Sequence, residues 1–238
     1  MKYLYLVIEI GVIIIPLAFS FDKKLMFYKN FKTLALSMSL VAAFYIIWDI
    51  YFTKNNIWGF NTYYYSSLTL IGLPIEEWLF FFIVPYASIF IHQSLILYFP
   101  KVELSVSTTN IITYALIVLF IILSIFYYKH IYTLFNAILV LIALIVSLYT
   151  KTRLLNKFYL SFLIILIPFL IVNGILTGSY IRNEIVWYNA DAIIGIRIST
   201  IPIEDVSYAF NLLFFNLFLF DKLTSMKNVN TKLTQHAL

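Results

Sequence analysis

The sequence predicts an all-α integral membrane protein with seven transmembrane helices, built as two parallel three-helix repeats joined by a linker helix. First, the 238 residues are 63% apolar and 11% charged, with a mean hydropathy of +0.94, which leaves too little polar surface for a water-soluble globule. Second, seven apolar runs each approach the roughly 20 residues that cross a bilayer as a helix. Third, a short acidic motif opens two of these runs.

The seven expected spans are residues 3–21, 33–52, 75–99, 109–128, 131–150, 158–177 and 203–220. A secretory signal peptide is the rival interpretation of residues 1–20. We discount it because this run is long, contains Glu9 and Pro16, and is required by the repeat. The chain has no cysteine, which excludes disulfides and thiol catalysis.

The basic residues divide unequally between the two ends of the spans, which explains the net charge of +5 without nucleic acid as a partner. One side holds Lys23, Lys24, Lys29, Lys32, Lys101, Lys151, Arg153, Lys157, Lys222, Lys227 and Lys232; the other holds Lys2, Lys54, Lys129, Arg182 and Arg197. The positive-inside rule then predicts a multi-pass protein of the cell's inner (plasma) membrane, with the N-terminus outside and the C-terminus in the cytoplasm.

The acidic motif occurs twice at an offset of 128 residues. Its two copies read Pro74-Ile75-Glu76-Glu77 and Pro202-Ile203-Glu204-Asp205, and they hold four of the chain's eleven acidic residues. A proline suits the first helical turn, and the helix dipole favours acidic residues there. Two copies that open on the same side of the membrane are harder to explain as capping alone, so we expect these four acids to carry the chemistry.

Subtracting 128 places the last three spans close to the first three. We therefore expect a first repeat over residues 1–100, a linker helix over 101–130 and a second repeat over 131–222, followed by a polar, disordered cytoplasmic tail over 223–238. Each half has an odd number of spans, so a linker helix is needed to begin the second half on the original side. A one-residue gap would align Trp187 with Trp58.

Other polar residues suggest how the two halves differ. Asp49 ends the second span on the side of the acidic motifs and could complete an acid cluster; we see no counterpart in span six, so the halves are not expected to do identical work. The aromatic and amide-rich segment 55–65 suits either a lid over an apolar cavity or an aromatic belt. Glu9 is either a functional intramembrane acid or a side chain that reaches water.

Paired carboxyl groups beside hydrocarbon point to acid catalysis. Removal from water disfavours a charged carboxylate, and a second carboxyl group disfavours it further. A carboxylic acid held neutral can protonate a weak base such as a carbon–carbon double bond. Aromatic faces then stabilise the carbocation without trapping it, and the chain has 19 Tyr, 23 Phe and 4 Trp. We expect both acid pairs to face one apolar pocket shared by the halves.

Two Pro-x-Glu-(Glu/Asp) motifs, each opening a helix in tandem three-span halves, resemble the membrane-integral lycopene cyclases of the bacterial heterodimeric type, fused into one chain as in archaeal and fungal enzymes. The resemblance covers nearly the whole chain. It implies an isomerase-type lycopene β-cyclase of carotenoid biosynthesis, which protonates a ψ end of lycopene or a related acyclic carotenoid, closes a ring and loses a proton to give a β-ionone end.

On this resemblance the catalytic residues are Glu76, Glu77, Glu204 and Asp205, with Pro74 and Pro202 structural. The substrate-binding residues would be Trp48, Asp49, Trp58, Asn61, Asn173 and Trp187. No metal site is expected, and no flavin or dinucleotide cofactor, because no Gly-x-Gly-x-x-Gly follows a strand. Membrane lipid is an expected partner, and association with other carotenoid enzymes is compatible with this role.

Other functions use parts of the same pattern. A carotenoid hydratase or another polyene cyclase would need the same acid. A proton-coupled transporter also places carboxylates in a repeat-related cavity, but here the acids gather near one face rather than across the midplane. A retinal photoreceptor requires a lysine in its last span, and residues 203–220 contain none. A prenyltransferase would be expected to carry Asp-rich magnesium sites, which the sequence lacks.

Overall fold

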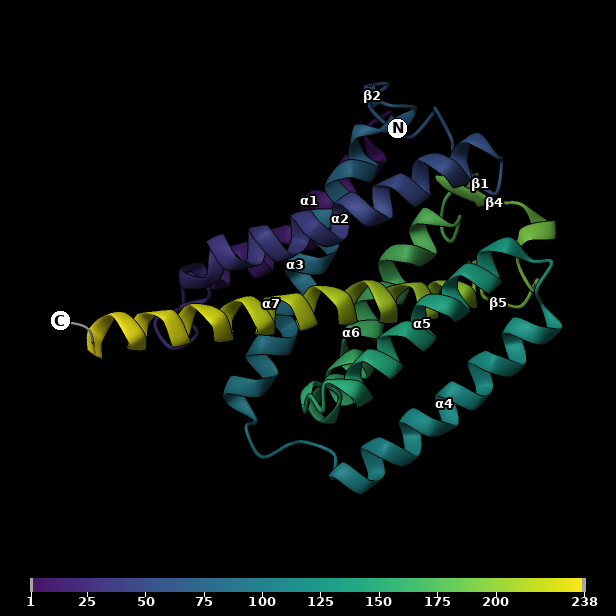
Figure 1. Ribbon diagram of the computed structural model, residues 1–238. Helices are drawn as coiled ribbons and strands as arrows, with labels where there is room; N and C mark the ends of the chain where they lie inside the picture. Colours follow the sequence, from purple (N-terminus) through teal and green to yellow (C-terminus); the bar gives the residue numbers. More distant parts are fainter. Residues whose placement is uncertain (1, 237–238) are drawn as a thin grey trace.

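The computed structural model describes residues 2–236, with side chains described through residue 227. Helices form a bundle (Figure 1). The α-helices in this part of the chain are α1 (Leu4–Phe19), α2 (Phe31–Lys54), α3 (Ile75–Tyr98), α4 (Val106–Phe126), α5 (Ile131–Tyr149), α6 (Leu154–Leu176) and α7 (Glu204–His236), with short 3-10 helices η1 (Phe27–Asn30) and η2 (Ala190–Ala192). Among residues 2–236, six helices are long and apolar enough to cross a membrane, and α1 is a shorter apolar helix of 16 residues.

The helices confirm an all-α, multi-pass membrane protein, and their bounds follow the expected spans closely. The expected disorder of the tail was wrong for residues 223–236, because α7 continues to His236. No Gly or Pro interrupts α7, so the backbone has no residue that would end the helix where the apolar segment ends. Residues 237–238 lie outside the described part.

The helices of each half pack on each other and on the other half. Helix α1 packs on α3, and α5 on α7, while α2 contacts α7 and α3 contacts α6 across the halves. Helix α4 lies at the edge of the bundle against α5 (Figure 1). A buried aromatic core fills the centre, where the ring centroids of Phe158 and Phe210 are 5.2 Å apart. In a membrane such rings hold helices together by van der Waals packing, because lipid is as apolar as the core.

A buried polar network also joins the halves. The Tyr45 hydroxyl on α2 donates to the Asn211 side chain on α7. The Asn211 amide in turn donates to Asn136 Oδ1 on α5 at 3.2 Å. Each such hydrogen bond adds about 1 kcal/mol, and breaking one would leave a buried group unpaired. The network therefore fixes how α7 sits between the two halves.

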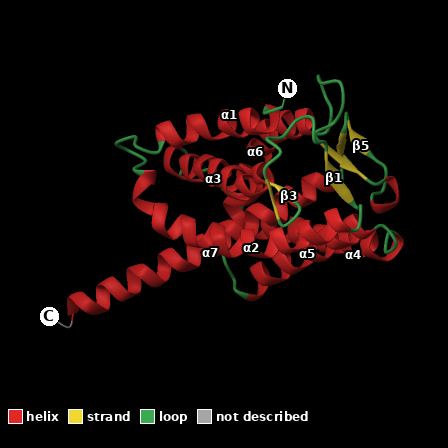
Figure 2. Ribbon diagram, turned by 90° about the horizontal axis from the view of Figure 1, so that it is seen from above, coloured by secondary structure: helices red, strands yellow, loops and turns green. Residues whose placement is uncertain are grey.

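Six short strands gather at one end of the bundle, while α7 projects from the other end (Figure 2). Strand β1 (Trp58–Phe60) pairs antiparallel with β4 (Val186–Tyr188). The hairpin of β2 (Thr69–Leu70) and β3 (Leu73–Pro74) precedes α3, and the hairpin of β5 (Arg197–Ile198) and β6 (Ile201–Pro202) precedes α7.

The β1–β4 pair lies on the pseudo-twofold axis between the halves. Gly59 stands opposite Trp187 in the ladder. Two backbone hydrogen bonds flank this pair: Asn61 N donates to Ile185 O at 2.8 Å, and Asn189 N donates to Ile57 O at 2.9 Å. The offset of 128 residues converts each of these bonds into the other. The expected one-residue gap was therefore wrong, because Trp187 corresponds to Gly59 and not to Trp58.

The two hairpins also share their backbone geometry. Ser67 has a φ of 72° where Gly195 has 88°, and Ile71 has 53° where Ser199 has 57°. The left-handed region is costly for residues with a side chain, so its recurrence at matched positions shows that the repeat extends to the turns.

The two motif prolines lie in the hairpins rather than in the first helical turn as expected. Pro74 ends β3 and precedes α3, and Pro202 ends β6. A proline fits the edge of a short strand because it has no N–H to donate. The acids that follow lie in the first turns of α3 and α7 as predicted.

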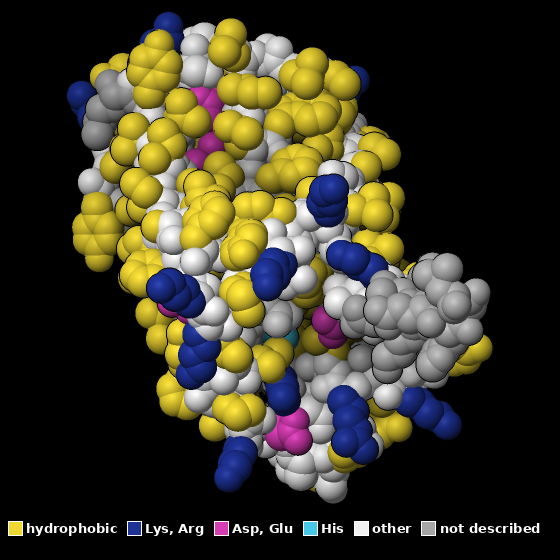
Figure 3. Space-filling model, turned by 90° about the vertical axis from the view of Figure 1, so that its left-hand side faces the viewer, with side chains coloured by type: hydrophobic (Ala, Val, Ile, Leu, Met, Phe, Trp, Pro, Cys, Tyr) yellow, Lys and Arg dark blue, Asp and Glu magenta, His cyan; other side chains and the backbone are white. Residues whose placement is uncertain are grey.

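Basic side chains gather at the end of the bundle from which α7 projects. Figure 3 views this end and shows Lys and Arg in its lower part, with a largely hydrophobic surface above them. This is the distribution that the loop charges predict.

Candidate functional site

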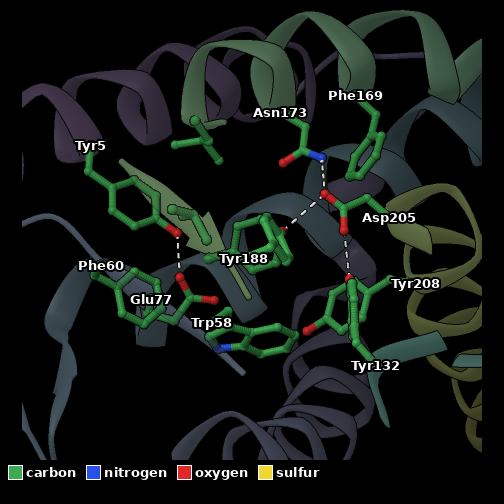
Figure 4. A pocket seen from close by; sticks show the side chains of 13 residues that line it. Tyr5, Trp58, Phe60, Glu77, Tyr132, Phe169, Asn173, Tyr188, Asp205 and Tyr208 are labelled. Carbon is green, nitrogen blue, oxygen red and sulfur yellow. Dashed lines mark hydrogen bonds between the residues drawn. The ribbon is translucent and has the colours of Figure 1, made fainter. Parts of the chain in front are cut away.

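A small cavity lies where β1 and β4 cover the ends of five helices (Figure 4). Its volume is about 40 Å³. We call it the acid cavity; its lining residues are Tyr5, Trp58, Phe60, Glu77, Phe80, Tyr132, Phe169, Asn173, Leu176, Val186, Tyr188, Asp205 and Tyr208. Both halves contribute to it, and none of the lining residues is basic. Strands β1 and β4 contribute Trp58, Phe60, Val186 and Tyr188 to its wall.

On the side of the first half, Glu77 belongs to a pair of buried carboxyl groups. The Tyr5 hydroxyl donates to Glu77 Oε2 at 2.6 Å. The Glu77 carboxyl also lies within hydrogen-bonding reach of the Asp49 carboxyl, and Trp58 Nε1 donates to Asp49 Oδ1 at 2.6 Å. Asp49 Oδ2 has no hydrogen-bond partner among the described residues. Two neighbouring carboxyl groups with no cation beside them disfavour ionisation of both.

On the side of the second half, Asp205 accepts three hydrogen bonds. Tyr132 donates to Oδ1 at 2.6 Å, and Asn173 and Tyr188 donate to Oδ2 at 2.7 Å and 3.0 Å. Removal from water, and then the nearby Asp205 charge, raise the pKa of the Tyr188 phenol well above its ordinary value. Tyr188 therefore remains a donor across the physiological pH range. Three donors are the environment that an ionised carboxylate requires.

The two sides are related by the repeat but differ in charge. Tyr5 and Tyr132 donate to Glu77 and Asp205 in the same way. Asn173 stands beside Asp205 as Asp49 stands beside Glu77. The offset of 128 aligns Asp49 with Thr177, which is not acidic; Asn173, one helical turn earlier, places a neutral amide beside Asp205. One site is a carboxyl pair, and the other is a carboxylate with an amide.

Glu76 and Glu204 do not line the acid cavity, contrary to the expected sharing of one pocket by all four acids. Glu76 Oε1 accepts from Ser66 N at 2.8 Å, and Glu204 Oε1 accepts from Ile194 N at 2.6 Å. Successive helical residues point about 100° apart, so only the second acid of each motif can face the cavity. The first acid ties the preceding loop to the helix.

Glu204 also faces a different cavity. Thr133 Oγ1 donates to its Oε1 at 2.6 Å, and among the described residues its Oε2 has no partner. The cavity beside it has a volume of about 500 Å³ and lies between α4, α5, α6 and α7. It shares no lining residue with the acid cavity.

Aromatic rings form a wall of the acid cavity. The centroid of Tyr132 is 5.1 Å from that of Trp58 and 5.6 Å from that of Tyr188. Tyr208 lies 6.1 Å from Trp58. These four rings come from β1, α5, β4 and α7, and they place π-electron faces around the carboxyl groups. Such faces attract a positive charge held between them.

The other residues singled out by sequence lie away from the acid cavity. Trp48 packs on Phe135 with centroids 4.2 Å apart. The Asn61 amide donates to Glu184 O at 3.2 Å and so holds a loop. Trp187 covers Gly59, and because strand side chains alternate, it lies on the face of the ribbon opposite Trp58 and Tyr188.

Glu9 is 2% exposed, so it does not reach water as one of the two interpretations supposed. Its two carboxyl oxygens have no partner among the described residues, and the group interacts electrostatically with Glu76. Glu9 is therefore a buried acid behind the first motif, and it does not line the acid cavity.

Sequence reasoning missed several lining residues. Tyr5 and Tyr132 could have been found, since both lie at the starts of spans one and five and are within one residue of the offset of 128. Phe80, Phe169 and Tyr188 carry no such signal, because they are ordinary aromatic residues in an aromatic-rich chain. Within the described residues, no three His, Cys, Asp or Glu side chains are placed to hold a metal ion.

Comparison with known proteins gives one match. A family model described as lycopene cyclase matches residues 2–95 and 129–223. Each matched region contains one acidic motif, and the whole of α4 lies between them. No curated protein and no solved structure matches the chain.

Proposed function

The chain belongs to the lycopene cyclase family, and from that premise we propose that it converts ψ end groups of lycopene, or of a related acyclic carotenoid, into β-ionone rings. The observation that carries the proposal is the acid cavity, where repeat-related Glu77 and Asp205 enter one aromatic enclosure from different halves. Their different hydrogen-bond partners support different roles in one reaction.

The Asp49–Glu77 pair is the proposed proton donor. Glu77 is the member of the pair that lines the wall, and with no cation in that wall the neutral form of one acid is favoured. Trp58 and Tyr5 donate to the two carboxyl groups at 2.6 Å each, so the anion left after proton transfer is stabilised in place. A general acid positioned in this way accelerates a reaction about 10²- to 10⁴-fold.

The aromatic wall is the proposed carbocation site. Proton transfer to the terminal double bond leaves a tertiary cation. The π electrons of the neighbouring double bond then form the ring carbon–carbon bond, and the positive charge moves to the ring. Trp58, Tyr132, Tyr188 and Tyr208 would stabilise this charge through their faces. The Tyr132 and Tyr188 hydroxyls donate to Asp205, which fixes the orientation of these two rings.

Asp205 is the proposed base. Its three donors match an ionised carboxylate that can accept a proton from the carbon next to the cationic centre. That loss forms the ring double bond. One proton enters at Glu77 and one leaves to Asp205, so the product is an isomer and the oxidation state does not change. The reaction therefore needs no redox cofactor.

The remaining predicted residues take supporting roles in this proposal. Glu76 and Glu204 would position the acids by holding the preceding loops through Ser66 and Ile194. The proposed location is the plasma membrane with the N-terminus outside and the C-terminus in the cytoplasm. The basic residues gathered near one end of the bundle support it (Figure 3).

The test is expression in a lycopene-accumulating bacterium, followed by pigment chromatography and by an assay of purified protein in liposomes made with D₂O. We expect β-cyclised carotenoid with deuterium in the ring. Asp205→Asn should exchange deuterium into recovered lycopene without cyclising it, whereas Glu77→Gln should do neither. Unchanged lycopene with the wild type would refute the proposal, and a hydroxylated acyclic product would show a hydratase.

A further inference from the structure

A large groove opens to the side of the bundle between α1, α3 and α6. It is lined by residues 8–16 of α1, 80–91 of α3 and 165–176 of α6, and we call it the membrane groove. Its volume is about 470 Å³. Gly11 is exposed, and Ile15 is 62% exposed, and both lie on the apolar helix α1. The groove therefore opens toward the hydrocarbon of the bilayer.

The membrane groove borders the acid cavity. Phe80, Phe169, Asn173 and Leu176 line both spaces. Asn173 is the residue whose amide donates to Asp205 at 2.7 Å. The groove thus ends beside the acid cavity, whereas the cavity beside α4 shares no lining residue with it.

The acid cavity is too small for a substrate end group, so it must open into the membrane groove before the substrate can enter. The acid cavity, at about 40 Å³, has room for only a few water molecules at roughly 10–15 Å³ each. A ten-carbon isoprenoid end group is far larger. The side chains that line both spaces include the rings of Phe80 on α3 and Phe169 on α6. Rotation of these two rings would join the spaces without movement of a helix.

We propose that the membrane groove binds the polyene chain of the substrate, and that its end group enters the acid cavity between Phe80 and Phe169. This inference rests on the proposed function. The groove wall is apolar except for Ser88 and Asn173, which suits a long hydrocarbon without polar groups. The reacting end is then held beside Glu77 and Asp205 while the rest of the molecule stays in the groove or in lipid.

Gly11 allows the groove to be filled without disturbing its walls. A Cβ atom added at Gly11 would meet no heavy atom within 4 Å. We would compare Gly11→Ala, Gly11→Leu and Gly11→Trp with Ile14→Trp, a control on the same helix that is 59% exposed and does not line the groove. Ile175→Trp would fill the groove from the α6 wall.

Two readouts separate binding from chemistry. The first is the initial rate of lycopene cyclisation in liposomes. The second is the amount of lycopene that copurifies with protein carrying Glu77→Gln, which binds substrate without converting it. We expect Gly11→Trp and Ile175→Trp to lower the rate at least tenfold and to abolish copurification, with Gly11→Leu intermediate. Gly11→Ala and Ile14→Trp should match the wild type, and equal thermal unfolding temperatures would show that the variants fold.

Full rate and full copurification with both Trp variants would overturn the membrane groove as the polyene site while leaving the proposed function intact. Loss of copurified phospholipid, with no effect on lycopene, would identify the groove as a lipid site and overturn the proposal in the same way. Absence of cyclisation and of bound lycopene in the wild type would instead refute the proposed function itself.

Discussion

The adjacent residues Glu76 and Glu77 give a sharp test of the site, because their carboxyl groups face different surroundings. In Glu77→Gln, the amide oxygen can still accept from Tyr5 and the amide nitrogen can donate to Asp49. The substitution therefore removes the transferable proton and little else. Loss of a general acid costs about 10²- to 10⁴-fold in rate, so we expect cyclisation to fall by at least a hundredfold.

Glu76→Gln is the matched control. Its amide oxygen can accept from Ser66 N as the carboxylate does at 2.8 Å. The amide nitrogen would take the place of Oε2, which has no partner among the described residues. The substitution therefore leaves no additional buried group unpaired. We expect a near-unchanged unfolding temperature and less than about a fivefold loss of rate, since this group does not line the acid cavity.

The assay is the initial rate of ring formation in liposomes at equal amounts of folded protein, with unfolding followed by intrinsic fluorescence in detergent. Equal losses of rate in Glu76→Gln and Glu77→Gln would refute the distinction between the two acids. A large loss in Glu76→Gln with a small one in Glu77→Gln would reverse it.

Three further predictions follow from the strands and turns. Gly59→Ala would place Cβ 2.5 Å from Trp187 Cζ2, so it should lower the free energy of unfolding by about 1–3 kcal/mol. The unfolding temperature should fall in Gly59→Ala and recover in the double variant Gly59→Ala with Trp187→Ala. An unchanged temperature in Gly59→Ala would contradict the packing of Trp187 on Gly59. Gly195 has a φ of 88°, so Gly195→Ala should lower the free energy of unfolding by about 1 kcal/mol. An unchanged unfolding temperature would show that residue 195 does not adopt this left-handed conformation. Tyr188→Phe removes the 3.0 Å bond to Asp205, worth about 1.5–3 kcal/mol, and should slow cyclisation about tenfold or more while Tyr63→Phe, at an exposed loop residue, does not.

The sequence predicts the helices well because a transmembrane span is a local property. Each apolar run must satisfy its own backbone in lipid, so span bounds and repeat offset can be read without tertiary information. The tail of α7 shows where this fails, since polarity alone suggested disorder but nothing in residues 223–236 breaks a helix.

The candidate site was predicted only in part. The sequence places the motif acids at helix starts, and the apolar composition makes carboxyl groups there unusual. The side of the helix to which each carboxyl group points depends on how the helix is rotated about its axis in the bundle. Which of Glu76 and Glu77 faces the cavity is set by the packing of α3 on α1, and the sequence contains no separate sign of it. The pairing of Asn173 with Asp205 arises in the same way, from residues on α6 and α7 that meet only after folding.

The β1–β4 pair has a consequence for how the two halves depend on each other. Each half supplies a single strand whose only ladder partner lies in the other half. A half on its own would expose an unpaired strand edge and would own just one of the two carboxylates that face the acid cavity. Two polypeptides produced by cutting the chain before α5 would therefore form an obligate heterodimer, in which each subunit completes the β1–β4 ribbon and the acid cavity of the other.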